Sequence, residues 1–259
     1  MLMREARDRV ALVTILRKEI HRFLRIWPQT LLPPAITTTL YFVIFGTVIG
    51  RRIGDMGGRD YMEYIVPGLV MMSIINSAYA NVSSSFFGAK WGRHVEELLV
   101  SPATPAVILC GYIGGGILRG LLVGVIVLTI ATLFAGWQMH APLLTLLFAV
   151  LTAAVFALAG FINAVLARNF DGISLVPNFI LTPLTYLGGV FYSVELLPEP
   201  WRSMSLVNPI LYMINGLRHG LLGIGDVPVA AALGVVMVFV VVFIVVARHL
   251  ILRSTGLRS

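Results

Sequence analysis

Charged residues are scarce in this chain of 259 residues. They make up 12% of the sequence, whereas 58% of it is hydrophobic and the mean hydropathy is +0.91. Soluble domains carry about 25% charged residues and about 45–50% apolar ones. Because the interior volume of a soluble fold is limited, such a fold could not cover this much apolar surface. The composition therefore excludes a soluble domain and predicts a membrane protein.

Several kinds of chemical site are also missing. The single cysteine, Cys110, excludes a disulfide framework or a cysteine zinc site within one chain, and no two histidines stand at metal-ligand spacing. The run from Gly114 to Gly116 is not followed by a lysine, so it is not a phosphate-binding P-loop. No Gly-x-Ser-x-Gly elbow offers a nucleophile. We expect no metal site, no cofactor bound by this chain and no enzymatic activity.

Long apolar runs are what the sequence does contain. A spanning helix needs about 20 mostly apolar residues, and these runs are too long and continuous for the alternating strands of a barrel. They predict an all-α membrane protein with one membrane domain, residues 1–259. We expect about six transmembrane helices, near residues 31–49, 64–87, 106–135, 142–167, 173–194 and 227–247.

The net charge of +7 fits membrane topology better than a nucleic-acid partner, which we do not expect. Lys and Arg concentrate before the first expected span, after the second, and around the end of the last. Cytoplasmic loops carry an excess of Lys and Arg. Both termini should therefore be cytoplasmic.

The segment before the first span, residues 1–27, has the pattern of an amphipathic helix. Leu16, Ile20, Phe23 and Trp27 recur, together with Leu12, at three- to four-residue spacing and so share one apolar face. The pattern favours a helix lying in the membrane interface, in contact with lipid. The alternative is a plain positive flank that sets the topology, but such a flank needs no periodicity.

Residues 88–105 form the most charged internal segment on the expected cytoplasmic side. Val95, Leu98 and Leu99 share one helical face, and Pro102 ends the helix. The pattern favours a short helix that docks a partner. A solvated loop is the alternative, although it would not need the apolar face.

Residues 195–225 are apolar but too interrupted to span. The interruptions include Pro198, Trp201, the pair Asn208 and Pro209, and Arg218. Broken backbone at membrane depth is tolerated only where protein or a water-filled cavity shields it. We expect short re-entrant or interfacial helices on the outer side, with an ordinary loop on the headgroups as the alternative.

Arg119 is the charged residue expected inside a span. An intramembrane arginine is costly and is by default a sign of function, which makes Arg119 a candidate for a translocation path. The alternative is that Arg119 lies near the inner side and extends its long side chain to the interface. No carboxylate lies well inside an expected span, which disfavours an ion-driven carrier.

Together these parts resemble the type-2 ABC exporter permeases, the ABC-2 family. The pattern of Leu197, Pro198, Trp201, Asn208, Pro209 and Arg218 resembles the family's signature between its last two spans, and residues 93–102 resemble its coupling segment. The resemblance covers nearly the whole chain. It implies that two copies pair as a homodimer and that each docks one cytoplasmic ABC ATPase, which binds the ATP and Mg²⁺. The residues it assigns to this docking are Arg93, His94, Glu96, Glu97 and Leu98.

The resemblance further implies export of an amphipathic or lipid-like substrate along a path between the two copies, in a bacterial inner (plasma) membrane. Two alternatives remain. An ion-coupled secondary transporter would need a deep carboxylate or an internal repeat, and a lipid-modifying membrane enzyme would need polar residues at catalytic spacing. Neither feature is evident in the sequence.

Overall fold

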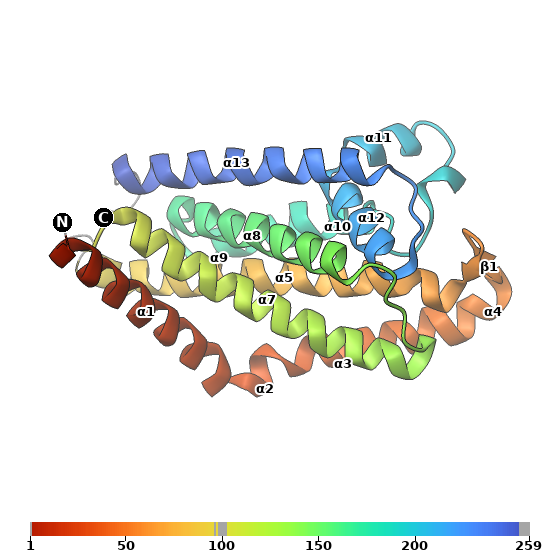
Figure 1. Cartoon of the computed structure of the whole chain (residues 1–259), viewed down its shortest axis with the longest axis horizontal. Helices are drawn as coiled ribbons and strands as arrows, with labels where there is room; N and C mark the ends of the chain where they lie inside the picture. The colour runs from red at the N-terminus through yellow and green to blue at the C-terminus, as the bar shows by residue number, and fades with distance from the viewer. Residues whose placement is uncertain (1, 96, 98–102, 254–259) are drawn as a thin grey trace.

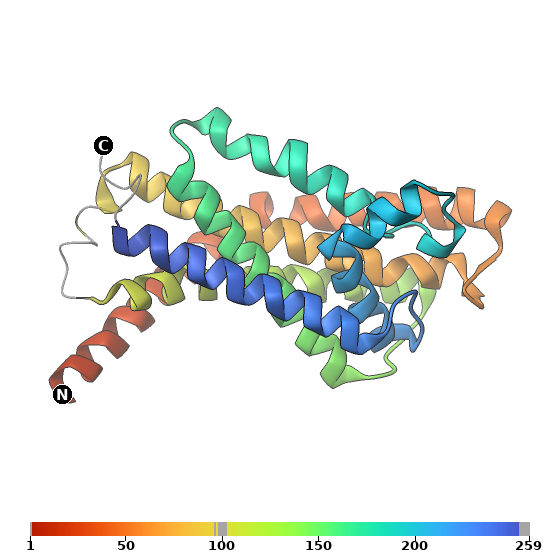
Figure 2. The ribbon, with the colours of Figure 1, turned by 90° about the horizontal axis from the view of Figure 1, so that it is seen from above.

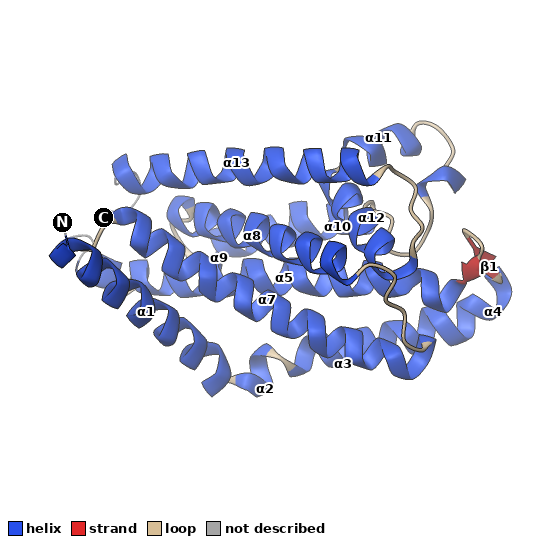
Figure 3. Cartoon of the chain, viewed as in Figure 1, coloured by secondary structure: helices blue, strands red, loops and turns tan. Residues whose placement is uncertain are grey.

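The structure, a computed structural model, is a bundle of long antiparallel helices (Figures 1 and 3). It describes residues 2–95, 97 and 103–253. The prediction of an all-α membrane protein is confirmed, because helices dominate and the described residues form only one two-stranded hairpin. Five helices are long and apolar enough to cross a membrane: Trp27–Ile49, Tyr61–Trp91, Pro105–Ala135, Pro142–Leu166 and Val229–Arg253. The total of six spans stays a prediction.

The N-terminal helix leans across the bundle before the chain makes its first pass (Figure 1). Pro28 lies near the start of the short helix that follows, and Pro33 and Pro34 lie at the start of the next, where a missing N–H costs little. The elements up to the hairpin are α1 (Leu2–Arg25), α2 (Trp27–Thr30), α3 (Leu32–Tyr41), η1 (Phe42–Ile49), α4 (Gly50–Ile53), β1 (Asp55–Met56) and β2 (Arg59–Asp60).

The central helix, α5 (Tyr61–Trp91), packs along α7 (Pro105–Ala135) and α8 (Pro142–Leu166). Glycine lets the backbones come close. A Cβ at Gly160 of α8 would lie 2.5 Å from the backbone oxygen of Tyr79 in α5. Small residues allow such close helix contacts in membranes, where apolar burial alone does not drive association.

The next pass is shorter than the sequence predicts. It consists of α9 (Phe170–Leu175), η2 (Val176–Leu181) and α10 (Thr182–Tyr186) and stands at the edge of the bundle in Figure 2. The expected span continued to residue 194. The helix ends earlier because the chain turns at Gly189, whose φ is +76°. Val190, in the loop that follows, and Val194, at the start of a short 3-10 helix, extended the apolar run and are instead buried in the protein.

The remaining elements are η3 (Val194–Leu196), α11 (Trp201–Val207), α12 (Pro209–Leu222) and α13 (Val229–Arg253). The Asn208 carboxamide oxygen caps α12 by accepting a 3.0 Å hydrogen bond from the Ile210 N–H. Figure 1 shows that α1 begins and α13 ends at one end of the bundle, which we name the terminal end. The β1–β2 hairpin lies at the opposite end, the hairpin end.

Candidate functional site

A single strip that is not fully buried runs along the otherwise buried middle of helix α5. It consists of Met72, Asn76, Ala80, Ser84 and Gly88, each four residues after the last. Asn76, Ser84 and Gly88 are exposed, Met72 and Ala80 are half-buried, and the residues between the five are buried. A four-residue spacing keeps side chains on one helical face. This set, the α5 strip, is thus the one face of the central helix that the chain itself leaves uncovered between residues 72 and 88.

A groove follows part of this strip. It has a volume of about 220 Å³ between α3 and α5, and we name it the α3–α5 groove. Its lining is Pro33, Pro34, Thr37, Thr38, Tyr41, Leu69, Met72, Ser73, Asn76 and Ser77. Hydroxyl and amide groups are unfavourable against lipid unless they are hydrogen-bonded, and in membranes they mark helix contacts or pathways. The lining therefore suits contact with water, a substrate or another protein chain.

Part of this polarity is satisfied within the chain. The Thr38 hydroxyl lies 3.4 Å from the Ser73 hydroxyl, which joins α3 to α5. The Asn76 amide donates to the Met72 carbonyl at 2.9 Å, so its own carboxamide oxygen stays available on the exposed face. The groove can therefore accept hydrogen bonds at Asn76.

Aromatic side chains join the two flanking passes near the hairpin end of the groove. The hydroxyls of Tyr41 and Tyr186 lie 3.0 Å apart. Phe45 stacks on Phe191 with ring centroids 4.4 Å apart, and Phe191 also contacts Tyr41 edge-on at 5.6 Å. Such pairs contribute about 0.5–1.5 kcal/mol each beyond area burial. The α3–α5 groove is thus bounded on this side by contacts between α3, η1 and the segment around α10.

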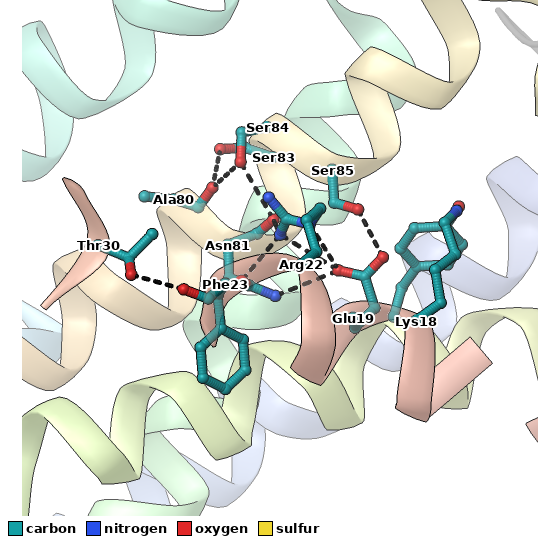
Figure 4. Close-up of polar contacts among 11 residues, drawn as sticks. Lys18, Glu19, Arg22, Phe23, Thr30, Ala80, Asn81, Ser83, Ser84 and Ser85 are labelled. Carbon is teal, nitrogen blue, oxygen red and sulfur yellow. Dashed lines mark hydrogen bonds and ion pairs between the residues drawn. The ribbon is translucent and has the colours of Figure 1, made fainter. Parts of the chain in front are cut away.

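Hydrogen bonds to a buried carboxylate and from its arginine partner fasten α1 to α5 (Figure 4). The Glu19 side chain is fully buried, and one carboxylate oxygen accepts a 2.6 Å hydrogen bond from the Ser85 hydroxyl. Arg22 Nη2 lies 3.2 Å from the other oxygen and donates to the Asn81 side chain at 2.8 Å. Paired and hydrogen-bonded charges are the form in which burial is tolerated. We name these four residues the Glu19 cluster.

Charged side chains also gather at the terminal end, where α5 stops. Arg93, in a left-handed turn with φ +59°, is exposed, as are His94 and Glu97. Val95 between them is buried, which anchors the turn in the core. Lys90 fixes the neighbouring helix, because its ammonium donates to the carbonyls of residues 165 and 167 at 2.7 and 2.8 Å. Two other predicted docking residues, Glu96 and Leu98, lie outside the described residues.

Comparison with known proteins shows which protein family the chain belongs to. The sequence pattern described as "ABC-2 type transporter" matches residues 10–222. The chain is 59% identical, over 96% of its length and 98% of the relative's, to "Inner membrane transport permease YadH" of Escherichia coli K12. It is 23% identical over 93% of its length, and 92% of the relative's, to "Nodulation protein J" of Neorhizobium galegae. The chain belongs to the ABC-2 type transporter family. It is a multi-pass transport permease, and the predicted resemblance is confirmed.

The predicted outer residues lie in two different settings in this permease. Pro198 and Trp201 are exposed, whereas Asn208 is buried. Arg218 is fully buried, with Nη2 2.6 Å from the Gly189 carbonyl and its guanidinium 4.1 Å from the centre of the Tyr64 ring. Its other terminal nitrogen lies 3.9 Å from the Asp226 carboxylate. Arg218 therefore ties α12 to the turn after α10 and to the loop before α13.

Pro209 follows Asn208 as the first residue of α12, where proline suits the helix start. The re-entrant geometry and outer location of these residues stay predictions.

The structure places Arg119 of the permease beside the corner between α1 and α3. Its Nη2 donates to the Thr30 carbonyl at 3.4 Å, while its buried Nε has no hydrogen-bond partner among the described residues. Arg119 thus contacts the bend around α2. Whether it also meets a substrate stays a prediction.

The predicted interfacial face of the permease is only partly turned outward. Phe23 is buried, Leu16 and Ile20 are half-buried, and Trp27 is exposed at the start of α2. Glu19 is the fully buried position of this helix. The apolar pattern does not predict its burial, because a charged residue is expected to face outward.

The α5 strip was missed as well. Its recurrence of Asn76, Ala80, Ser84 and Gly88 is a sequence signal that could have found it, because small and polar residues recur at one-turn spacing in an apolar run.

Proposed function

We propose that this permease is the membrane subunit of an ATP-driven exporter and that the α5 strip forms one wall of its translocation path. The observation that carries the proposal is that Asn76, Ser84 and Gly88, which are polar or small, lie exposed in one row on a helix that is buried on its other faces. The side chains of Asn76 and Ser84 donate to carbonyls of their own helix, which leaves their oxygen atoms as acceptors on the exposed face, where lipid offers no donor. Such acceptors are useful on a surface along which an amphipathic or lipid-like molecule moves, because this surface meets both polar and apolar groups.

The path is completed by a second copy of the chain. Large apolar side chains on α3 and on the pass through α10 stay exposed beside the groove, including Ile36, Leu40, Phe179 and Ile180. In a homodimer these two passes would flank a path between the copies. The name of the E. coli relative supports placing the permease in the inner membrane, and the distribution of Lys and Arg supports cytoplasmic termini.

The energy source is a separate cytoplasmic ATPase pair that binds ATP and Mg²⁺. Exposed Arg93, His94 and Glu97 at the terminal end, together with Glu96 and Leu98, suit charge-guided docking of such a partner. The buried Val95 and the capping Lys90 would pass a push on this segment to the ends of α5 and α8. Small shifts in a packed interface are transmitted because packed cores resist compression.

Co-purification with the ATPase encoded beside the permease gene tests the proposal. We expect the permease alone to be inactive, and the co-expressed pair to purify in equal amounts with ATPase activity. Reversing both charges in Glu96→Lys/Glu97→Lys should weaken assembly or uncouple ATP turnover from transport, whereas reversing the exposed Glu5 should not. Absence of any bound ATPase would contradict the proposal.

A further inference from the structure

A groove with a basic lining opens along the last two turns of α1. It has a volume of about 610 Å³, and its lining is Lys18, His21, Arg22, Leu24 and Arg25. We name it the basic groove. Lys18, Arg22 and Arg25 recur at three- and four-residue spacing and so lie on neighbouring positions of one helical face. No carboxylate is among the described lining residues, so these residues together carry an excess of positive charge.

Two of the lining side chains are held in place. Arg22 is fixed by Glu19 at 3.2 Å and by the Asn81 backbone and side-chain oxygens at 2.9 and 2.8 Å. Lys18 stands over the Tyr112 ring, with its ammonium 5.4 Å from the ring centre and 3.4 Å from the hydroxyl. Such contacts preorganise the cations, which lowers the entropy lost when an anion binds.

The two lining cations other than Arg22 have no carboxylate partner among the described residues. Arg25 is exposed and has no carboxylate partner within the part of the chain that the structure describes. The charge of Arg22 is balanced by Glu19, but Lys18 and Arg25 have no such balance there. A partner for this groove is therefore anionic, and two unpaired cations suit a phosphate group.

The groove lies where lipid headgroups are expected. Arg25 ends α1, and Trp27 begins the first candidate span with 51% of its surface exposed. Tryptophan at a span end and basic residues beside it are typical of the membrane–water boundary. Leu24, also in the lining, is 45% exposed and offers apolar surface next to the cations. A ligand with both a phosphate and a chain fits this pairing better than a free ion.

We propose that the basic groove binds the phosphate headgroup of an anionic phospholipid from the leaflet at the terminal end. Lys18 and Arg25 supply the unbalanced charge, Arg22 is fixed between them, and Leu24 contacts the start of an acyl chain. This binding requires neither an ATPase nor transport. Bound lipid would brace α1 against α5, because Arg22 contacts both the groove and Asn81.

Native mass spectrometry of the purified full-length chain in detergent tests the assignment. The chain is titrated with phosphatidylglycerol, with phosphatidylcholine as the neutral lipid and with inorganic phosphate as competitor. The test variant is Lys18→Gln/Arg25→Gln. The matched control is Arg9→Gln/Arg17→Gln, which removes the same charge from exposed positions of α1 that do not line the groove. A third variant, Lys18→Arg/Arg25→Lys, changes the same two positions but keeps both charges. If it still binds lipid, weaker binding by the test variant comes from the lost charge and not from a folding defect.

We expect the test variant to bind phosphatidylglycerol at least about tenfold more weakly, since each basic residue near an anionic lipid surface contributes on the order of a few-fold or more. The control and the charge-keeping variant should stay within about twofold of the wild type, and phosphatidylcholine should bind weakly to all. Equal losses in the test and control variants, or no loss in either, would overturn the site. Complete displacement of the lipid by millimolar inorganic phosphate would reassign it to a free anion.

Discussion

Removing the Glu19 carboxylate is expected to loosen α1 from the bundle. In Glu19→Ala, Arg22 loses the ion pair at 3.2 Å, and Ser85 loses its acceptor at 2.6 Å. Glu19 and Arg22 both belong to α1, so their ion pair can persist when the helix detaches. The hydrogen bonds that Ser85 and Asn81 donate to the Glu19 carboxylate are lost on detachment, and a hydrogen bond to a charged group contributes about 1.5–3 kcal/mol. We therefore expect α1 to detach about 2–3 kcal/mol more easily.

Limited trypsin digestion of the solubilised permease measures this detachment, with cleavage after Arg17 followed by mass spectrometry. While cleavage is slower than reclosing, its rate follows the population of the open state. A change of about 2–3 kcal/mol corresponds to roughly 30- to 150-fold faster cleavage. Glu5→Ala, at an exposed position of the same helix, is the control. Cleavage of Glu19→Ala within about twofold of the wild-type rate would refute the reasoning.

A double-mutant cycle separates the ion pair from the rest of the cluster. Glu19→Ala/Arg22→Ala removes both charges, so no unpaired charge remains in the interface. We expect its detachment energy to be smaller than the sum of the two single changes by about 1–2 kcal/mol, as for residues in direct contact. Strict additivity would show that the two side chains act independently.

Two further predictions concern packing elsewhere in the bundle. Gly160→Ala should abolish monodisperse folding by size-exclusion chromatography, because its Cβ would lie 2.5 Å from the Tyr79 backbone oxygen, whereas Gly234→Ala, with open space around it, should behave as wild type. Arg218→Ala should lower the thermal unfolding midpoint by several degrees, because it leaves buried acceptors unpaired, whereas Arg202→Ala at an exposed site should not. Equal behaviour within either pair would contradict the corresponding contact.

The long helices could be predicted from the sequence because hydrophobic length alone fixes a spanning helix. The pass around α10 shows the limit of that reasoning. Its apolar run continues through Val190 and Val194, but Val190 is buried in the loop after the turn at Gly189 and Val194 at the start of the separate short helix η3. Hydropathy reports that a residue avoids water. It does not report whether lipid or protein covers the residue, so the end of this helix at Tyr186 could not be predicted.

The candidate site depended on contacts that periodicity does not encode. Glu19 of α1 can be buried because Ser85 and Asn81 lie opposite it on α5 and donate hydrogen bonds to its carboxylate. Arg218 was predicted as part of an outer segment, yet its burial follows from contacts with Tyr64 and the Gly189 carbonyl, which are far away in sequence. Partners of buried polar groups are set by the fold, and a single sequence without its fold does not name them.

The claim that the α5 strip lines a path is tested most directly by cysteine accessibility in membrane vesicles. Cys110 is the single native cysteine and is replaced by alanine, and then Asn76→Cys, Ser84→Cys and Val125→Cys are made separately. Val125, 61% exposed on α7, serves as the lipid-facing control. We predict that a charged, membrane-impermeant maleimide labels the cysteines at 76 and 84 but not the one at 125. Equal protection of all three positions would contradict the account.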